Sequence, residues 1–338
     1  MNKILVTGGL GYIGSHVVVQ LLEKECQVVI LDDLSNSHES VLDGIYAITD
    51  KRVQLEKIDI KDKSSLIDFF DQHQGFDGVI HFAAKKSVGE SVVHPLMYYQ
   101  DNILGLLNLL ELCLAHKISN FIFSSSCTVY GEPDCLPISE TESIKPAASA
   151  YGATKQMGEQ ILYDFSKAYP LRTISLRYFN PVGAHPSGLI GELPLNIPQN
   201  LVPFVTQTAA GVLKELVVFG DDYNTPDGSC IRDYIHVQDL AEAHIAALEY
   251  LKDSNQSYEV FNIGTGKGTS VLELINTFVE VTGVPLSYRI GERRDGDLEA
   301  LYADPQKATK KLGWKSKLDI QQALVDAWNW EQRYRKLK

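Results

Sequence analysis

The residues whose types and spacing point most directly to chemistry are Tyr151 and Lys155. They stand four positions apart in Tyr151-Gly-Ala-Thr-Lys155, which places both side chains on one face of a predicted helix. A free tyrosine has a pKa near ~10 and is almost wholly protonated at neutral pH. A neighbouring ammonium favours the phenolate, so we expect Lys155 to lower the pKa of Tyr151 and let it act as a base. On its own such a pair is more often an exposed surface pair, so its meaning depends on the rest of the chain.

The N-terminal segment has the pattern of a nucleotide-binding turn. Residues 3–7 read as a buried strand that runs into a glycine-rich turn at 8–14 and then an apolar-periodic helix. The glycines permit close approach of the backbone to a pyrophosphate, and the helix N-terminus supplies free N–H groups. A second strand over 27–31 ends at Asp32, whose carboxylate can bind ribose hydroxyls and repels a 2′-phosphate. The pattern therefore predicts a dinucleotide site that favours NAD over NADP.

Another predicted strand, at 120–125, ends in three serines. Ser124-Ser-Ser126 emerges at the carboxyl edge of the sheet, and the helix with Tyr151 begins about two dozen residues later. Alone, such serines are usually turn or capping residues. Together with Tyr151 and Lys155, Ser126 can supply a hydroxyl on the other side of a substrate oxygen.

The order of the elements predicts a doubly wound α/β fold with a parallel sheet covered by helices on both faces. Strands are expected at 3–7, 27–31, 53–58, 78–83, 120–125, 173–178 and 260–263, and helices near 12–24, 63–73, 95–116, 150–169, 200–212, 237–252, 270–282, 305–312 and 319–335. We assign residues 1–180 to a Rossmann domain, to which 232–263 returns. We assign 181–231 and 264–338 to a smaller α/β lobe for the substrate.

Size and composition exclude several other classes of protein. The 338 residues suffice for two lobes, and the net charge of −12 argues against binding to nucleic acid, whose phosphates require a basic surface. We see neither a signal-peptide pattern nor an apolar run long enough for a bilayer, so we expect a cytoplasmic protein without a membrane partner. The five cysteines are widely spaced and form no CxxC pair, so neither a disulfide framework nor a metal site is expected.

Segments along almost the whole chain resemble the extended short-chain dehydrogenases/reductases and, among these, most closely the UDP-glucose 4-epimerases. The segments that carry this resemblance are TGGLGYIG at 7–14, Asp32, Asp59-Ile60, HFAA at 81–84, FSSSCTVYG at 123–131, YGATK at 151–155, RYFNPVGAHPSG at 177–188, IPQNLVPF at 197–204, IRDYIHVQDLA at 231–241 and RRDGDL at 293–298. The resemblance implies a reversible inversion at C4 of a UDP-hexose through a transient 4-keto sugar, with NAD retained as a prosthetic group. It also implies a homodimer held by a four-helix bundle, for which 95–116 and 150–169 carry apolar residues on more than one face.

The resemblance assigns roles to individual residues. Tyr151 takes the C4 hydroxyl proton, Ser126 hydrogen-bonds the same oxygen, and Lys155, together with the nicotinamide, holds the pKa of the phenol down. The residues implied to contact NAD are Gly8, Gly11, Tyr12, Ile13, Gly14, Asp32, Asp33, Asn36, Asp59, Ile60, Phe82, Ala83, Ala84, Lys86, Asn102, Tyr151, Lys155 and Phe179. Those implied to contact the UDP-sugar are Ser126, Tyr178, Asn180, Asn200, Leu201, Val217, Phe219, Arg232, Arg294, Asp297 and Leu301.

Some of these positions have a second interpretation. Arg232 can instead form an ion pair with Asp233 or Asp239, and Asn180 and Asn200 can cap turns or loops. Where the resemblance would give AGLK, this chain has Ala83-Ala-Lys-Lys86, so Lys86 is assigned by its register. Leu301 stands where the family alternates between bulky and small side chains, which leaves N-acetylated UDP-sugars as possible substrates.

The sequence leaves three alternative functions to compare with epimerisation. A 4,6-dehydratase of the same family would require an acid pair next to Ser126, where this chain has Cys127 and Thr128. A net dehydrogenase or reductase would consume free NAD(H). A non-catalytic NAD-sensing regulator would not require Ser126, Tyr151 and Lys155 together.

Overall fold

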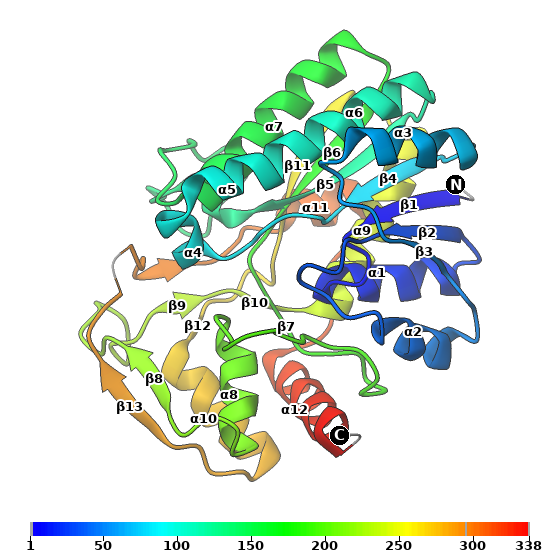
Figure 1. Ribbon diagram of the computed structural model, residues 1–338. Coiled ribbons are helices and arrows are strands. Elements are labelled where there is room, and N and C mark those ends of the chain that lie inside the picture. Colours follow the sequence, from blue (N-terminus) through cyan, green and yellow to red (C-terminus); the bar gives the residue numbers. More distant parts are fainter. Residues whose placement is uncertain (1–2, 295, 337–338) are drawn as a thin grey trace.

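The computed structural model describes residues 3–294 and 296–336, and its centre is a parallel sheet. The sheet has seven strands in the order β11-β6-β5-β4-β1-β2-β3 (Figure 1). Its strands are β1 (Lys3–Thr7), β2 (Gln27–Leu31), β3 (Gln54–Glu56), β4 (Gly78–His81), β5 (Asn120–Ser126), β6 (Arg172–Tyr178) and β11 (Tyr258–Ile263). The strand order reverses between β1 and β4, as in a doubly wound sheet, so the predicted fold class is confirmed. Asp295 of the RRDGDL segment, and residues 1, 2, 337 and 338 of the assigned domains, lie outside the described residues.

Helices cover both faces of the sheet. One face packs against α1 (Tyr12–Glu23), α2 (Val41–Thr49) and α9 (Val237–Asp253), and the other against α3 (Lys63–Gln72), α6 (Gly105–Ala115) and α7 (Ala150–Ala168) (Figure 1). Ile4 and Val6 lie in the core below the sheet and Leu5 in the core above it, because successive strand residues point to opposite faces. Burial on both faces explains why β1 is apolar throughout its centre rather than alternating.

The helix expected at 95–116 is divided into three parts. It consists of α5 (Pro95–Tyr99), a π-helical turn η1 (Gln100–Leu104) and α6, and the short α4 (Val88–Val93) precedes it. Asn102 lies in the π turn and is buried, with its amide bonded to the backbone of Lys85 and to Thr154 Oγ1. Apolar periodicity predicts one continuous helix because it contains no information on this contact with a distant segment.

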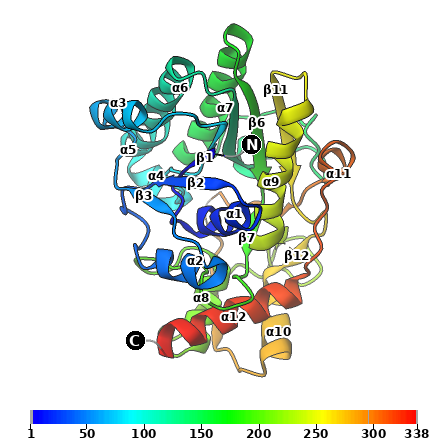
Figure 2. The ribbon, with the colours of Figure 1, turned by 90° about the vertical axis from the view of Figure 1, so that its right-hand side faces the viewer.

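The smaller lobe combines helices with very short strands. Its helices are α8 (Leu201–Ala209), α10 (Val271–Thr282) and α12 (Ile320–Lys336), and α12 crosses the bottom of the molecule (Figure 2). Its strand pairs are β7 (Asn180–Val182) with β10 (Tyr234–His236), β8 (Leu216–Phe219) with β13 (Tyr288–Gly291), and β9 (Ile231–Arg232) with both β12 (Thr269–Ser270) and β14 (Ala300–Leu301). Val205, Phe278 and Leu324 belong to its core. Most of these strands were not predicted, because two to four residues are too few to show a period.

The smaller lobe joins the sheet at its carboxyl edge. Tyr178 ends β6 and Asn180 begins β7, so no linker separates the two parts of the chain. The chain later returns: α9 covers the sheet, β11 pairs with β6, and α11 (Gln306–Leu312) packs on β11. Buried Asp233 fastens this junction by accepting hydrogen bonds from Thr265 N and Oγ1, Gly266 N and Ala303 N at 2.6–3.1 Å.

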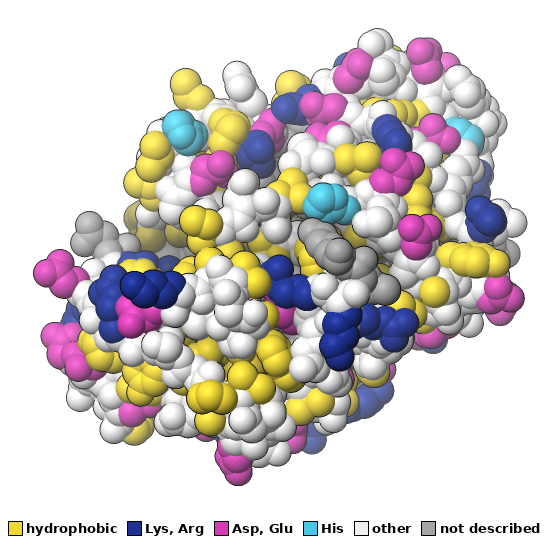
Figure 3. Space-filling model, turned by 60° about the horizontal axis from the view of Figure 1, so that its bottom comes forward, with side chains coloured by type: hydrophobic (Ala, Val, Ile, Leu, Met, Phe, Trp, Pro, Cys, Tyr) yellow, Lys and Arg dark blue, Asp and Glu magenta, His cyan; other side chains and the backbone are white. Residues whose placement is uncertain are grey.

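The surface is mixed in charge. The face seen in Figure 3 carries basic, acidic and apolar side chains interspersed, without one continuous basic surface. Within residues 3–294 and 296–336, no helix combines the length and apolarity needed to cross a membrane. The same part of the chain contains no group of His, Cys, Asp and Glu that could hold a metal ion.

Candidate active site

The glycine-rich turn leaves no room for side chains. Gly8 has a φ of +68°, and a Cβ built there would lie 2.8 Å from the backbone nitrogen of Ala83. A Cβ at Gly14 would lie 2.3 Å from the carbonyl oxygen of Gly8, because the first turn of α1 packs directly on the loop. Gly11 is the N-cap of α1 and makes no side-chain cap, and the first turn carries no acidic residue. The helix N-terminus can therefore accept an anion through its backbone N–H groups.

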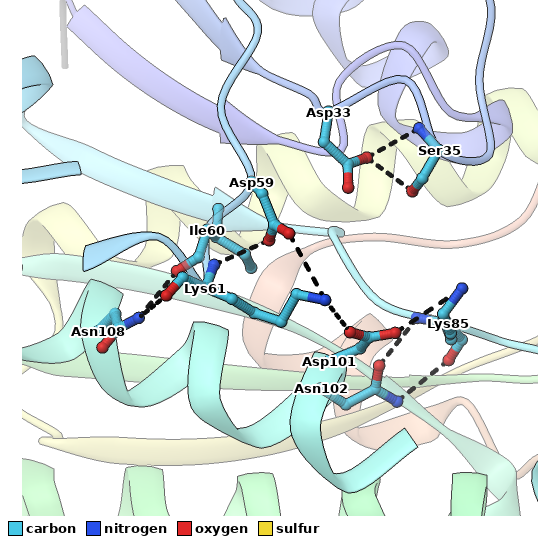
Figure 4. A network of polar contacts seen from close by, with 9 residues as sticks. All are labelled: Asp33, Ser35, Asp59, Ile60, Lys61, Lys85, Asp101, Asn102 and Asn108. Carbon is cyan, nitrogen blue, oxygen red and sulfur yellow. Dashed lines mark hydrogen bonds and ion pairs between the residues drawn. The ribbon is translucent and has the colours of Figure 1, made fainter. Parts of the chain in front are cut away.

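Asp32 is fixed at the end of β2. Its buried carboxylate accepts hydrogen bonds from Leu10 N and Leu34 N, both at 3.0 Å, and from Ser37 Oγ at 2.7 Å. These bonds hold the carboxylate beside the glycine turn, where the sequence analysis placed an acid for ribose recognition. The next residue, Asp33, accepts from Ser35 N and Oγ at 2.9 and 2.7 Å (Figure 4).

A polar network lies between the loop after β3 and the helices above the sheet, near Asp33 and Ser35 (Figure 4). Asp59 accepts from Lys61 N at 2.9 Å, and Lys61 Nζ forms ion pairs with Asp59 at 3.5 Å and with Asp101. Asn108 Nδ2 donates to the carbonyl oxygens of Ile60 and Lys61 at 3.0 and 3.2 Å. The network holds Asp59 and Ile60 in place, two of the residues implied to contact NAD.

Asn102 connects the loop after β4 to α7. Its Oδ1 accepts from Lys85 N at 2.8 Å, and its Nδ2 donates to Lys85 O at 3.1 Å and to Thr154 Oγ1 at 3.0 Å. Thr154 stands on α7 next to Lys155. The π turn thereby fixes the loop after β4 relative to the helix that carries the proposed acid–base residues.

Ser126, Tyr151 and Lys155 converge at the carboxyl edge of the sheet. Ser126 ends β5, and its Oγ accepts from Thr128 N at 3.2 Å and from Thr128 Oγ1 at 3.0 Å. Tyr151 lies in the first turn of α7, whose N-cap Ser149 accepts from Gly152 N at 3.1 Å. Lys155 Nζ lies 5.7 Å from the centre of the Tyr151 ring.

Burial governs the titration of this group. It raises the pKa of Tyr151 to about 12, although a hydrogen bond with Ser126 acts in the opposite direction. It lowers the pKa of Lys155 to about 7, and the carboxylate of Glu159, one turn further along α7, opposes that shift. In the protein chain by itself, desolvation of the phenolate therefore outweighs the lowering expected from Lys155. Lys155 Nζ instead donates to Ser124 O at 2.6 Å and lies 4.9 Å from the centre of the Phe123 ring.

Two arginines share the carboxylate of Asp297 where the smaller lobe meets the rest of the chain. Arg232 Nη2 lies 3.4 Å from Asp297 Oδ1, and Arg294 binds both oxygens of Asp297 at 2.8 and 3.1 Å. The alternative partners considered for Arg232 were wrong: Asp233 accepts from Thr265, Gly266 and Ala303, and Asp239 accepts from the backbone of Lys317 and Leu318. The Arg294 guanidinium also lies 4.9 Å from the centre of the Phe219 ring, which is 40% exposed.

Leu301 lies next to these cations. It pairs with Arg232 in the β9–β14 ladder, and it is buried in a cluster with Cys127 and Phe179. Its side chain therefore joins the strand that bears the arginine to residues beside Ser126. In β8, Val217 and Phe219 pair with Arg289 and Gly291 of β13.

The remaining predicted residues are spread around the same edge. Tyr12 donates its hydroxyl to Gly183 O at 2.6 Å, the hydroxyl of Tyr178 donates to Ser124 Oγ, and Asn180 N donates to Asp233 O at 3.0 Å. Asn36 is exposed, Asn200 is the N-cap of α8 without a side-chain cap, and Leu201 begins that helix. Phe82, Ala83 and Ala84 follow β4 beside the glycine turn. Lys86 Nζ and Asn200 Nδ2 both bind Glu192, at 3.1 and 2.6 Å.

Sequence reasoning missed Glu159 and Glu192. Glu159 is buried with Arg177, which binds both of its oxygens, and Ser125 Oγ donates to it at 2.5 Å. Its position four residues after Lys155 on the same helix face was a usable signal. Glu192 lies in an irregular loop, where no spacing rule indicates its partners.

A doubly wound sheet with the glycine turn after its first strand and Tyr151 and Lys155 on a covering helix is the fold of the extended short-chain dehydrogenases/reductases. A family model described as GDP-mannose 4,6 dehydratase matches residues 5–327. The UDP-glucose 4-epimerase of Yersinia enterocolitica is 50% identical over 331 residues, which cover 97% of each chain. The chain therefore belongs to the extended short-chain dehydrogenases/reductases and, within them, to the UDP-glucose 4-epimerases.

Solved structures agree with this membership. A UDP-glucose-4-epimerase from Stenotrophomonas maltophila with bound NAD and formylated UDP-arabinopyranose has a TM-score of 0.96 at 46% identity, and the match covers 100% of both chains. A UDP-glucose 4-epimerase from Bifidobacterium longum in complex with NAD+ and UDP has a TM-score of 0.95 at 44% identity, over 99% of both chains.

The residues after Ser126 do not favour dehydration. Burial raises the pKa of the Cys127 thiol to about 12, and Thr128 donates its hydroxyl to Ser126. A 4,6-dehydratase would require a pair of carboxylic acids next to Ser126. Cys127 and Thr128 do not form such a pair, because neither side chain is a carboxylic acid.

Proposed function

We propose that this protein reversibly inverts C4 of UDP-glucose and UDP-galactose through a transient 4-keto sugar, with NAD held tightly throughout. The observation that carries the proposal is the convergence of Ser126, Tyr151 and Lys155 at the carboxyl edge of the sheet, the same edge at which the glycine turn follows β1. Membership of the UDP-glucose 4-epimerases supplies the substrate class.

Residues 1–180, with 232–263, form the proposed NAD domain. The fit is supported by the turn at Gly8 and Gly14, which a Cβ would block, and by the anchored carboxylate of Asp32. Bound NAD would supply a reversible acceptor for the C4 hydride and a positive charge on its nicotinamide ring. That charge would offset the burial that raises the pKa of Tyr151 to about 12.

The residues of the chain have separate roles in the proposed reaction. Tyr151 accepts the proton of the C4 hydroxyl and returns it to the same oxygen after the ketone has turned over. Ser126 hydrogen-bonds that oxygen, and Thr128 orients Ser126 through the hydrogen bonds from its N–H and hydroxyl. Lys155, anchored on Ser124 O, supports the phenolate from inside the sheet edge.

The smaller lobe, 181–231 and 264–338, together with Asn180 and Arg232 at its junction with the proposed NAD domain, is the proposed UDP-sugar site. Arg232 and Arg294 are fork-shaped cations suited to a diphosphate, and Asp297 keeps them together. The sugar must rotate between the two hydride transfers, so we expect most of the binding free energy to come from the UDP portion. Leu301 is intermediate in size, and on this basis we extend the proposal to N-acetylated UDP-hexoses.

We propose a homodimer through the outer faces of the helices above the sheet. Leu96, Leu104 and Leu107 are exposed on the segment α5–η1–α6, and Met157 and Tyr163 are exposed on α7. These two helical segments from each of two copies would form a four-helix bundle that buries the exposed apolar side chains.

The test is conversion of UDP-galactose by the purified protein without added NAD or reductant, followed by proton NMR of the sugar. The proposal predicts a mixture of UDP-galactose and UDP-glucose, reached from either side, with no net change in cofactor absorbance. Stoichiometric NADH formation would instead identify a dehydrogenase, and a product lacking the C6 hydroxyl would identify a dehydratase. No conversion by protein that retains NAD would refute the proposal.

A further inference from the structure

One carboxylate connects the two halves of the proposed site. Glu192 Oε1 lies 3.1 Å from Lys86 Nζ and accepts a hydrogen bond from Asn200 Nδ2 at 2.6 Å. Lys86 follows β4 in the proposed NAD domain, whereas Asn200 is the N-cap of α8 in the proposed UDP-sugar lobe. Glu192 therefore lies between a proposed cofactor ligand and a proposed substrate ligand.

The backbone around Glu192 is tightly held. Its carbonyl oxygen accepts from Trp330 Nε1 at 3.1 Å, and a Cβ at Gly191 would lie 2.6 Å from the Trp330 ring. Glu192 also borders a small cavity of about 10 Å³, enough for about one water molecule, together with Tyr12, Thr206 and Trp330. α12 thus fixes the position from which the carboxylate reaches across the junction.

The burial of Glu192 distinguishes it from an ordinary surface pair. Its side chain is 10% exposed, whereas that of Lys86 is 51% exposed. Exposed ion pairs contribute little to stability, but a mostly buried carboxylate must keep its hydrogen bonds. Glu192 lies among residues that are proposed to bind two diphosphates, and its negative charge alone would weaken anion binding. Its contribution to binding must therefore come from the orientation that it gives to Lys86 and Asn200.

The carboxylate determines what its two partners present to a ligand. A carboxylate only accepts hydrogen bonds, so the NH₂ group of Asn200 must face it and the amide oxygen of Asn200 faces away. The amide oxygen is then available to accept from a hydroxyl or N–H group of a ligand. The same carboxylate draws the Lys86 ammonium toward the smaller lobe.

We propose that Glu192 is a positioning residue that orients Asn200 toward the UDP-sugar and holds Lys86 at the junction of the two proposed sites, and thereby couples binding at the two sites. This inference rests on the proposed function. Glu192 should affect binding and not the proton transfer, because its hydrogen bonds and ion pair go to Lys86, Asn200 and Trp330 and not to Ser126, Tyr151 or Lys155.

The test compares Glu192→Gln and Glu192→Ala with the wild-type holoenzyme. We expect Glu192→Ala to raise KM for UDP-galactose about tenfold, with kcat changed by less than about threefold, the loss typical of one charged hydrogen bond. NAD retained through gel filtration should fall in parallel. Glu192→Gln, which keeps an acceptor oxygen without the charge, should recover part of the KM loss.

A double variant tests whether the effect passes through Asn200. Because Glu192 acts on the substrate by orienting Asn200, the Asn200→Ala/Glu192→Ala variant should have the KM of Asn200→Ala alone. The control is Glu242→Gln, which removes the charge of an exposed ion pair with Lys317 at 2.6 Å and should leave KM and NAD retention unchanged.

The inference fails if KM and NAD retention in both Glu192 variants equal those of the wild type. It also fails if kcat and thermal stability fall while KM stays constant, because a purely structural role would give that result. A third contradicting result is a double variant in which the KM effects of Asn200→Ala and Glu192→Ala multiply. These results are distinct from failure of the proposed function, in which the wild-type protein itself does not convert UDP-galactose.

Discussion

The ammonium of Lys155 lies one helical turn from Tyr151, with Nζ 5.7 Å from the centre of the phenol ring, yet it is bonded to the carbonyl oxygen of Ser124. Both groups are buried, and burial acts against the charged form of each: it raises the pKa of Tyr151 to about 12 and lowers that of Lys155 to about 7. The two residues are thus positioned for proton transfer but are not activated by their own chain alone. A positive charge from a bound nicotinamide would complete the arrangement.

Asp297 should matter for substrate binding through the two arginines that it holds. We expect Asp297→Asn to raise KM for UDP-galactose about tenfold with a small effect on kcat, because Arg232 and Arg294 lose the anion that fixes their geometry. Steady-state kinetics measure this change. Asp222→Asn, which breaks the neighbouring Arg293 pair at 2.7 Å, is the matched control and should leave KM unchanged. Equal effects of the two substitutions would contradict a specific role for Asp297.

Leu301 should influence the choice between plain and N-acetylated sugars. It packs with Cys127 and Phe179 beside the proposed sugar site, so a bulkier side chain there should collide with an acetamido group. We expect Leu301→Tyr to lower kcat/KM for UDP-N-acetylgalactosamine relative to UDP-galactose by about 10-fold or more. Leu301→Met, which conserves volume, should keep the wild-type ratio. If Leu301→Tyr leaves the ratio of the two kcat/KM values unchanged, Leu301 does not determine the choice between the two sugars.

The proposed dimer depends on the apolar outer face of α5–η1–α6. Leu96 is 76% exposed, and Leu96→Glu would place a charge in the proposed interface. Sedimentation velocity should show a dimer for the wild type and a shift toward monomer for this variant. Ile197→Glu is the control, because Ile197 is 71% exposed but lies in the loop before α8. A wild-type monomer, or equal dissociation of both variants, would contradict the proposed bundle.

Three buried histidines should make the fold sensitive to acid. Burial lowers the pKa values of His16 and His81 to about 3 and that of His244 to about 4, from an ordinary value of 6.5. Below 6.5 the unfolded chain binds protons that the folded chain does not, so the free energy of unfolding falls as pH decreases toward 4. The three residues together should give a slope of up to about 4 kcal/mol per pH unit, about 1.4 for each proton.

Urea unfolding between about pH 7 and about pH 5 measures this slope. We expect His244→Gln to reduce it by up to about 1.4 kcal/mol per pH unit. His38→Gln, at an exposed position, should leave it unchanged. A slope of zero in the wild type, or no difference between His244→Gln and the wild type, would show that these histidines titrate alike in both states.

The sheet and its covering helices could be predicted from the sequence because they depend on local patterns. The apolar run before Gly8, the helix that begins near Tyr12 and the acid at the end of β2 are each specified within a few residues. The convergence of Ser126 with Tyr151 also followed, since the ends of parallel strands meet at one edge of a sheet.

The rest of the site depends on contacts between distant segments. The π turn at Asn102 arises where that residue meets Lys85 and Thr154, and no periodicity within the helix shows this. The partner of Arg232 is Asp297, 65 positions away, rather than either nearby aspartate. Spacing shows which charge lies near Tyr151 but not how deeply both groups are buried, and this burial raises the pKa of Tyr151 in the chain by itself to about 12.

In the proposed reaction the Tyr151 phenol carries the proton of the C4 hydroxyl. This role is tested by the kcat of Tyr151→Phe for UDP-galactose, measured on protein that retains NAD and binds UDP, with the exposed Tyr169→Phe as control. We expect kcat to fall by at least about 100-fold in Tyr151→Phe while UDP binding is kept, and to stay at the wild-type value in Tyr169→Phe. A Tyr151→Phe protein with wild-type turnover would contradict the account.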